Sequence, residues 1–205
     1  SLTNLVFAPL AEGLKSVSLS ANWMWPSKNE GEDARLYKAV EACSNFASDL
    51  GINIPTGKDS LSMTQQYGED KVFSPGTVII SAAGEVSNVR KIVSPTLAYI
   101  KGTYLYYVDF SFDTLKLGGS AFAQTLGKIG DEAPTVNDAE YFKNAFAAIQ
   151  ELVNRGLIIA GHDVSEGGLV TTLLEMCFAN PAGGIEARLN KIRYSDMIKI
   201  LFSEN

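Results

Sequence analysis

The sequence predicts an α+β protein built in two consecutive parts. Strand-like runs recur along the 205 residues, and segments with helical apolar spacing lie between them. A polar, basic stretch over residues 87–95 interrupts this alternation, and we expect it to separate a first domain, 1–90, from a second, 91–205. Neither an internal repeat nor a low-complexity tract accompanies the pattern. The alternation is typical of the α+β or α/β class.

The first part is expected to open with a strand and a long helix. Residues 15–20 alternate polar and apolar side chains, which is the period of a half-buried strand. An aromatic loop over residues 22–26 should follow, closed by its proline. Residues 31–50 then repeat apolar side chains at three- and four-residue steps, with acidic residues at the start, where a helix favours negative charge. Gly51 is a suitable C-cap for this helix.

The remainder of the first part is expected to hold a charged turn between strands. A short apolar stretch, 52–55, leads into the turn Gly57-Lys58-Asp59-Ser60. Residues 77–86 form an apolar run that is typical of a buried strand. Strand signals therefore lie on both sides of the charged turn.

In the second part, helical patterns alternate with shorter β-like runs. The expected elements, in order, are a strand at 103–108, a helix after the turn 118–120, a helix at 138–155, a strand at 157–160 and a helix at 169–178. The helix at 138–155 has the clearest pattern, because Phe142, Phe146 and Val153 fall on one face. The polar segment 161–168 lies between the last strand and the last helix.

Composition and charge exclude several classes of protein. The net charge is −6 with both signs interspersed, which argues against a general nucleic-acid or polybasic membrane role. No stretch approaches the roughly 18 unbroken apolar residues of a membrane span. With one histidine and no Cys-x-x-Cys pair, a structural zinc site is not expected. Cys43 and Cys177 each lie in an apolar helical pattern, so we expect two buried free thiols and a cytoplasmic location.

The turn Gly57-Lys58-Asp59-Ser60 is the first candidate for chemistry. It is not a Walker A loop, because five residues instead of four separate Gly51 from Gly57, and Asp59 stands where that loop needs Ser or Thr. A glycine, a cation, a carboxylate and a hydroxyl nevertheless suit a phosphorylated ligand or its metal. The alternative is a charged turn without a ligand.

The segment His162-Asp163-Val164-Ser165-Glu166-Gly167-Gly168 is the second candidate. Its expected position puts Asp163 and Ser165 beside a helix N-terminus, where backbone N–H groups favour phosphate and a carboxylate can recruit Mg²⁺. Alternatively, Ser165 is only an N-cap, Asp163 a solvated turn residue, and the glycines serve tight packing. His162 is either a packing residue or an acid–base group.

Four segments, taken together, carry a family resemblance. They are L-S-A-N-W-M (19–24), G-E-D-A-x-L-Y (31–37), I-P-x-G-K-D-S-L-S-M (54–63) and H-D-V-S-E-G-G-L (162–169). In order and spacing they resemble the large form of phosphoribosylformylglycinamidine synthase, and residues 201–204 resemble that family's L-F-x-E segment. The chain begins without methionine, and we expect it to be an internal piece of such an enzyme that is inactive alone.

The resemblance implies a fold and a reaction. The family's synthetase core is similar to a duplicated aminoimidazole ribonucleotide synthetase, in which each half has a barrel-forming A-type domain and an α/β B-type domain. Residues 1–90 would be most of the second A-type domain, and 91–205 the start of the second B-type domain. The reaction converts formylglycinamide ribonucleotide to formylglycinamidine ribonucleotide with ATP, Mg²⁺ and ammonia from a glutaminase domain. Implied partners are this substrate and the enzyme's remaining domains, without nucleic acid or membrane.

The resemblance also implies roles for individual residues. At an auxiliary nucleotide site, Asn4 and Asp163 would bind Mg²⁺ and Ser165 would contact ATP or ADP, while a further glutamate ligand would precede Ser1. At the catalytic site, Gly57 and Lys58 would lie near ATP, Lys58 and Asp59 would act in catalysis, and Ser60 would lie near the ribonucleotide. Asn22 would also neighbour a nucleotide. Smaller family members have asparagine and an apolar residue at the positions of Lys58 and Asp59, so a metal-ligand role does not carry over to Lys58.

Two alternatives compete with this interpretation. One is another ATP-dependent synthetase or kinase of the same superfamily, such as aminoimidazole ribonucleotide synthetase or selenophosphate synthetase. The other is a nucleotide-binding structural module whose ligand only braces a larger enzyme.

Overall fold

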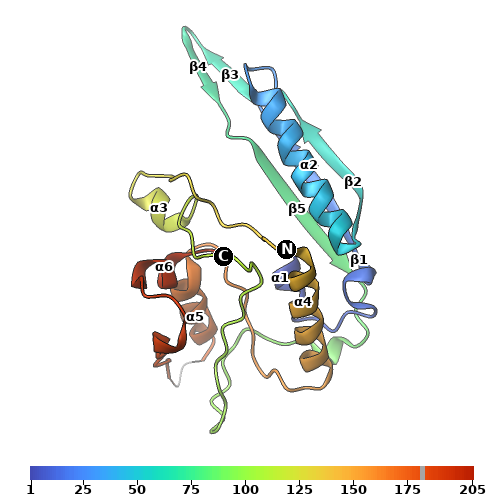
Figure 1. Cartoon of the computed structure of the whole chain (residues 1–205), viewed down its shortest axis with the longest axis vertical. Coiled ribbons are helices and arrows are strands. Elements are labelled where there is room, and N and C mark those ends of the chain that lie inside the picture. The colour runs from blue at the N-terminus through green and yellow to red at the C-terminus, as the bar shows by residue number, and fades with distance from the viewer. Residues whose placement is uncertain (181–182) are drawn as a thin grey trace. The chain divides into compact units, whose positions relative to one another are not determined.

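The computed structural model describes residues 1–180 and 183–205, which divide into two units (Figure 1). Unit 1 consists of Ser1–Leu5 and Leu10–Ser87, and unit 2 of Val6–Pro9 and Asn88–Asn205.

A three-stranded mixed sheet forms the body of unit 1. Strand β1 (Val17–Met24) lies in the middle, parallel to β2 (Asn53–Ser60) and antiparallel to β5 (Thr77–Gly84). Alternate residues of β1 are buried, namely Val17, Leu19 and Ala21. The strand therefore has one apolar face, as its sequence pattern predicts.

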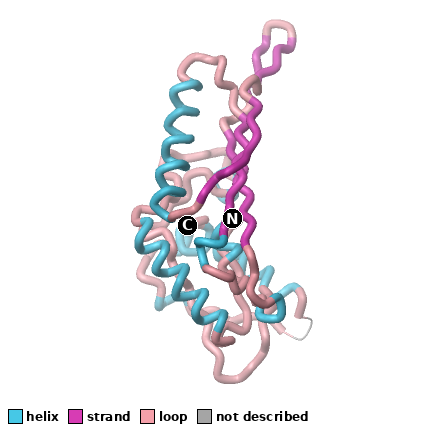
Figure 2. Tube along the Cα trace, turned by 90° about the vertical axis from the view of Figure 1, so that its right-hand side faces the viewer, coloured by secondary structure: helices cyan, strands magenta, loops and turns pink. Residues whose placement is uncertain are grey.

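Helix α2 (Glu32–Leu50) runs alongside this sheet (Figure 2). Its C-terminal residues Ala47 and Leu50 are buried, and Gly51 ends the helix at a φ of 72° by donating its N–H to Ala47 and Ser48. The left-handed conformation explains why glycine stands at this end. The expected helix at 31–50 and its cap are confirmed.

Two segments of unit 1 that were expected to be loops are strand instead. Residues 22–24 of the predicted aromatic loop belong to β1, and the predicted charged turn at 57–60 is the end of β2. Both predictions were wrong because β1 and β2 pair in parallel up to Met24 and Ser60, a pairing that joins residues far apart in sequence.

Residues beyond β2 also differ from expectation. A hairpin that the sequence did not suggest, β3 (Thr64–Tyr67) with β4 (Asp70–Phe73), lies between β2 and β5. The strand predicted at 77–86 is present as β5 (Thr77–Gly84), but it is not buried, since Ile79 is 51% exposed. The other elements of unit 1 are helix α1 (Leu2–Leu5) and a 3₁₀ turn at Gly13–Ser16.

Helix α4 (Ala139–Asn154) is the longest helix described in unit 2. The side chain of Asp138 caps it by accepting a hydrogen bond from the N–H of Tyr141, 2.9 Å away. Phe142, Phe146 and Val153 are buried along one face, which confirms the predicted helix at 138–155.

The other core of unit 2 forms where α5 (Gly168–Phe178) meets α6 (Met197–Phe202). Leu169 and Leu173 of α5 and Ile200 of α6 form a buried cluster with Leu115. The predicted helix at 169–178 is confirmed. The helix expected after Ser120 is α3 (Ala121–Thr125), capped by the Ser120 hydroxyl. Two 3₁₀ turns, Val89–Lys91 and Leu189–Lys191, complete the unit.

Two strands expected in unit 2 are absent from the described residues. Residues 103–108 and 157–160 carry β-type sequence, yet neither segment is assigned to a strand. Tyr104 and Tyr106 are about four-fifths exposed, at 81% and 80%. Apolar, β-branched sequence forms a strand only against a hydrogen-bonding neighbour, so propensity alone overpredicts here. With the sheet in unit 1 and helices in both units, the α+β class is confirmed.

Two further expectations concern single features. Both Cys43 and Cys177 are free, as predicted, but each is half-buried instead of buried. Among the residues that the structure describes, no helix has both the length and the apolar character required to cross a membrane.

Candidate functional site

The end of β2 brings three of the predicted site residues to one face of the sheet. Lys58 and Ser60 are two residues apart on the strand, and the Lys58 Nζ donates to the Ser60 Oγ at 3.2 Å. Asn22 of β1 is the register partner of Lys58. The Asn22 Oδ1 is buried and has no hydrogen-bond partner among the described residues. This face therefore presents a cation, a hydroxyl and an unsatisfied acceptor.

Asp59 belongs to the opposite face. Neighbouring residues of a strand point to opposite sides, and Asp59 lies in register with Trp23 instead of Asn22. The sequence placed Lys58 and Asp59 together in a turn, where both could face one ligand. In a strand their side chains do not converge, so the expected catalytic pair is not brought together by β2.

Gly57 has a structural reason to be glycine. A Cβ at this position would lie 2.2 Å from the carbonyl oxygen of Ala21 on β1. The two backbones approach closely just beyond an irregularity in the register between Ser18 and Ser20. The glycine is thus required by strand pairing, whether or not a nucleotide also approaches it.

The second candidate segment is held by its own side chains and by α5. Each ring nitrogen of His162 faces an oxygen: Nδ1 lies 2.8 Å from the carbonyl oxygen of Asp163, and Nε2 lies 3.1 Å from the carboxylate of Glu175. The Asp163 side chain is 15% exposed, with Oδ1 3.5 Å from the His162 Nδ1. His162 is therefore a packed, hydrogen-bonded residue of the segment, and Glu175 is a neighbour that the sequence did not suggest.

Ser165 is exposed and does not cap α5. The N-cap residue is Gly167, at a φ of 89°, and no side chain of its own serves as a cap. The Ser165 carbonyl accepts from the N–H of Gly168 at 2.9 Å. The alternative that Ser165 is only an N-cap is therefore wrong, and its hydroxyl stays at the surface beside the helix start.

A phosphate was expected at the N-terminus of α5. A carboxylate of the chain itself, that of Glu204, is bonded there. The Oε1 of Glu204 accepts from the N–H of Gly167 at 2.8 Å and from the N–H of Ala121, the first residue of α3, at 2.9 Å. A carboxylate at a helix N-terminus gains charge-assisted hydrogen bonds and a favourable dipole interaction. In the sequence, Glu204 stood out only as part of the L-F-x-E segment of the family resemblance. That segment does not predict the hydrogen bonds to Gly167 and Ala121.

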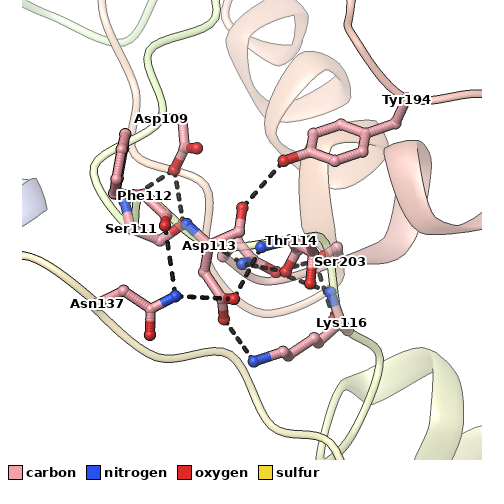
Figure 3. A network of polar contacts seen from close by, with 10 residues as sticks. Asp109, Ser111, Phe112, Asp113, Thr114, Lys116, Asn137, Tyr194 and Ser203 are labelled. Atoms are coloured by element: carbon pink, nitrogen blue, oxygen red, sulfur yellow. Dashed lines mark hydrogen bonds and ion pairs between the residues drawn. The ribbon is translucent and has the colours of Figure 1, made fainter.

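The neighbours of Glu204 bind a different segment (Figure 3). The Ser203 hydroxyl donates to the carbonyl of Lys116 at 2.9 Å. Asn205 accepts from the N–H of Lys116 at 3.0 Å and donates to the carbonyl of Thr114 at 3.1 Å. Residues 203–205 thus connect three backbone segments of unit 2.

The donor chemistry of the predicted metal ligands suits Mg²⁺ only in part. Asp163 supplies a carboxylate in unit 2 and Asn4 an exposed amide in unit 1, and both offer the oxygen donors that a hard cation prefers. Among the described residues, no cluster of three or more His, Cys, Asp or Glu side chains could hold a metal ion. Each residue, taken within its own unit, offers one oxygen donor.

Comparison with protein families agrees with the division into two units. Residues 1–85 match the family described as the FGAR-AT PurM_N-like domain. Residues 101–205, half of the chain, match the C-terminal domain of AIR synthase related proteins.

Curated relatives extend over nearly the whole chain. A "Probable phosphoribosylformylglycinamidine synthase" of Caenorhabditis elegans is 40% identical over 87% of the chain. The Arabidopsis thaliana "Probable phosphoribosylformylglycinamidine synthase, chloroplastic/mitochondrial" and the Homo sapiens "Phosphoribosylformylglycinamidine synthase" are 42% and 40% identical over all of it. The chain spans 14%, 14% and 15% of the length of these three relatives.

Solved structures share the fold at much lower identity. The structure of PurLQS from Thermotoga maritima superposes with a TM-score of 0.57 at 12% identity, covering 100% of this chain and 30% of that one. T. maritima PurL complexed with ATP gives a TM-score of 0.55 at 12% identity over 99% of this chain and 29% of that one. The ordered motifs, the two matching domains and the relatives lead to one assignment: the chain belongs to the phosphoribosylformylglycinamidine synthase family, with an FGAR-AT PurM_N-like region followed by an AIR synthase-related C-terminal domain.

Proposed function

We propose that the full-length protein carrying this chain converts formylglycinamide ribonucleotide to formylglycinamidine ribonucleotide. ATP drives the reaction, and glutamine supplies ammonia through a glutaminase domain. The observation that carries the proposal is the 40–42% identity to relatives that bear the name of this synthase. In this proposal, residues 1–90 act as an A-type domain and 91–205 as the start of a B-type domain.

The reaction proceeds in two steps. The substrate's amide oxygen attacks the γ-phosphorus of ATP, ADP leaves, and an O-phosphorylated imidate forms. Ammonia then adds to the amide carbon, the C–O bond breaks, and phosphate departs to leave the amidine. Both steps develop negative charge on phosphoryl oxygens, and fixed donors in a dry site stabilise such charge.

The face of unit 1 that carries Lys58 contributes to the first step. The Lys58 ammonium offsets the charge of the transferring phosphoryl group, and the Ser60 hydroxyl, 3.2 Å from it, orients the ribonucleotide. The buried, unsatisfied Oδ1 of Asn22 fits a donor group of the nucleotide, since a buried acceptor without a partner is costly. Asp59, on the opposite face, contributes no contact to this ligand.

The segment 162–168 of unit 2 contributes to an auxiliary nucleotide site. Mg²⁺, when bound there, would link the nucleotide phosphates to the protein's oxygen donors. Asp163 would supply one of these donors, and Ser165, which is exposed, would contact the nucleotide.

The test uses the full-length protein with ATP, glutamine and the ribonucleotide. We expect an amidine product detectable by mass spectrometry, and Lys58→Ala should lower kcat/KM by about 100-fold or more, as loss of one fixed donor does elsewhere. Lys38→Ala is the matched control, because Lys38 is an exposed lysine of α2 in the same unit. Both variants should have melting temperatures close to that of the wild type. If Lys58→Ala leaves kcat/KM unchanged, this face has no catalytic role. If the full-length protein forms no amidine product, the proposed reaction is refuted.

A further inference from the structure

Glu204 joins two helix starts that are far apart in sequence. One carboxylate oxygen, Oε1, accepts hydrogen bonds from Gly167 before α5 and from Ala121 at the start of α3. Both donors are backbone N–H groups without an acceptor in their own helix. Because the acceptor is charged, each bond is stronger than a neutral one.

The segment bonded by Glu204 also packs closely against α6. A Cβ on Gly168 would lie 2.7 Å from the carbonyl oxygen of Leu201 and 2.7 Å from the backbone of Phe202. This glycine therefore packs against the C-terminal end of α6. Gly167 accepts in turn from the Thr171 hydroxyl at 3.1 Å. The C-terminal end of the segment 162–168 is therefore fixed from two sides, by α5 and by residues 201–204.

We infer that Glu204 is a positioning residue, which fixes the segment 162–168 so that Asp163 and Ser165 are presented in one geometry. The inference rests on the proposed function for the role of Asp163 and Ser165, but not for the bonds of Glu204. Removing a residue that orients a metal ligand through hydrogen bonds typically lowers metal affinity or activity by about 10- to 100-fold.

The chain offers a matched control for this inference. Asn205 adjoins Glu204 and makes two backbone hydrogen bonds, to Thr114 and Lys116, on a different segment. Asn205 also bonds the hydroxyls of Ser111 and Ser203. Asn205→Ala thus removes more hydrogen bonds from the same C-terminal stretch than Glu204→Ala does, without touching Gly167, and is a demanding control. Glu204→Gln keeps an acceptor oxygen and loses only the charge, which guards against a variant that fails to fold.

The experiment compares Glu204→Ala, Glu204→Gln and Asn205→Ala in the full-length protein. Hydrogen exchange is measured first, without nucleotide, over the peptide that covers 161–168. We expect Glu204→Ala to speed exchange there by about tenfold or more, Glu204→Gln to give a smaller increase, and Asn205→Ala to leave it unchanged. Binding of ATP with Mg²⁺ should weaken by about tenfold in Glu204→Ala and stay within twofold in Asn205→Ala.

Two outcomes would overturn the inference. One is exchange at 161–168 that is equal in Glu204→Ala and the wild type. The other is an equal effect of Glu204→Ala and Asn205→Ala on exchange and binding, which would make Glu204 only a general stabiliser. Asp163→Asn, measured alongside, separates this result from the proposed function. If Asp163→Asn binds nucleotide normally while Glu204→Ala still speeds exchange, the auxiliary site is wrong and the positioning of the segment stands.

Discussion

Two carboxylates of unit 2 show how single side chains organise irregular backbone. Glu204 binds the starts of two helices, while Asp113 holds a turn by accepting from the N–H of Thr114 at 2.8 Å and pairing with the Lys116 ammonium at 2.6 Å. Asn137 also donates to Asp113, at 3.1 Å (Figure 3). The hydrogen bond from Lys116, with further help from Thr114 and Asn137, holds the pKa of the Asp113 carboxyl below its usual range.

The Asp113 network predicts an acid-sensitive contribution to stability. Because its pKa is lowered in the folded chain, the ionised Asp113 stabilises the fold above the unfolded value of about 4, and this contribution is lost as the pH falls through the folded pKa. Asp113→Asn should therefore lower the melting temperature at pH 7, and the difference from the wild type should shrink below about pH 4. Thermal unfolding between pH 7 and 3 measures it.

Glu186→Gln provides the control for that series. The Glu186 side chain is 82% exposed and its ion pair with Arg188 lies in solvent, so its removal should change the melting temperature little at any pH. A difference between Asp113→Asn and the wild type that persists undiminished at pH 3 would mean that the Asp113 charge is not what stabilises the turn.

The helices are defined by local contacts, whereas the strands depend on pairing with distant parts of the chain. Helix α4 is defined locally, by the Asp138 cap and by apolar residues at helical spacing. Strand β2 depends on its neighbour: from Thr56 to Ser60 it pairs residue by residue with Ser20 to Met24 of β1. Gly57 lies in this pairing, where the Ala21 carbonyl occupies the space of a side chain.

At the scale of these strands, Gly57→Ala should separate packing from ligand contact. A methyl group 2.2 Å from the Ala21 oxygen forces the strands apart, and such overpacking typically costs about 1–3 kcal/mol. We expect a lower free energy of unfolding in denaturant, measured without nucleotide. Gly184→Ala is the control, since a Cβ at that position would meet no atom of the described residues within 4 Å. If Gly57→Ala leaves the free energy of unfolding unchanged, strand packing does not require glycine at position 57, and contact with a ligand remains as its explanation.

At the scale of the whole molecule, the chain forms two units that match a small part of much longer relatives. Its relatives are longer by far, since the chain spans only 14–15% of their length. Unit 1 carries the face with Lys58 and unit 2 carries Asp163. In the part of the chain that the structure describes, no cluster of three or more His, Cys, Asp or Glu side chains could hold a metal ion. The proposed reaction has three reactants, and its catalysis would require that all be held in line at once.

The isolated chain is therefore expected to form no amidine from the ribonucleotide, ATP and ammonium above the uncatalysed background. Mass spectrometry of the reaction mixture measures the product, and the full-length protein under the same conditions shows that the assay detects it. Circular dichroism of the same sample verifies that the chain is folded. Robust turnover by the folded, isolated chain would refute the proposal that the active site needs other domains.

The sequence by itself determined the family and the helices. Helices α2, α4 and α5 were predictable because caps, apolar spacing and terminal glycines act within a few residues. The four ordered motifs were enough to indicate the family. Only the tertiary structure decided that residues 57–60 are strand, that 103–108 and 157–160 are not, and that Glu204 bonds Gly167. The physical reason is distance along the chain: strand pairing and the contacts of a carboxylate join residues tens of positions apart, and no local pattern records which partners meet.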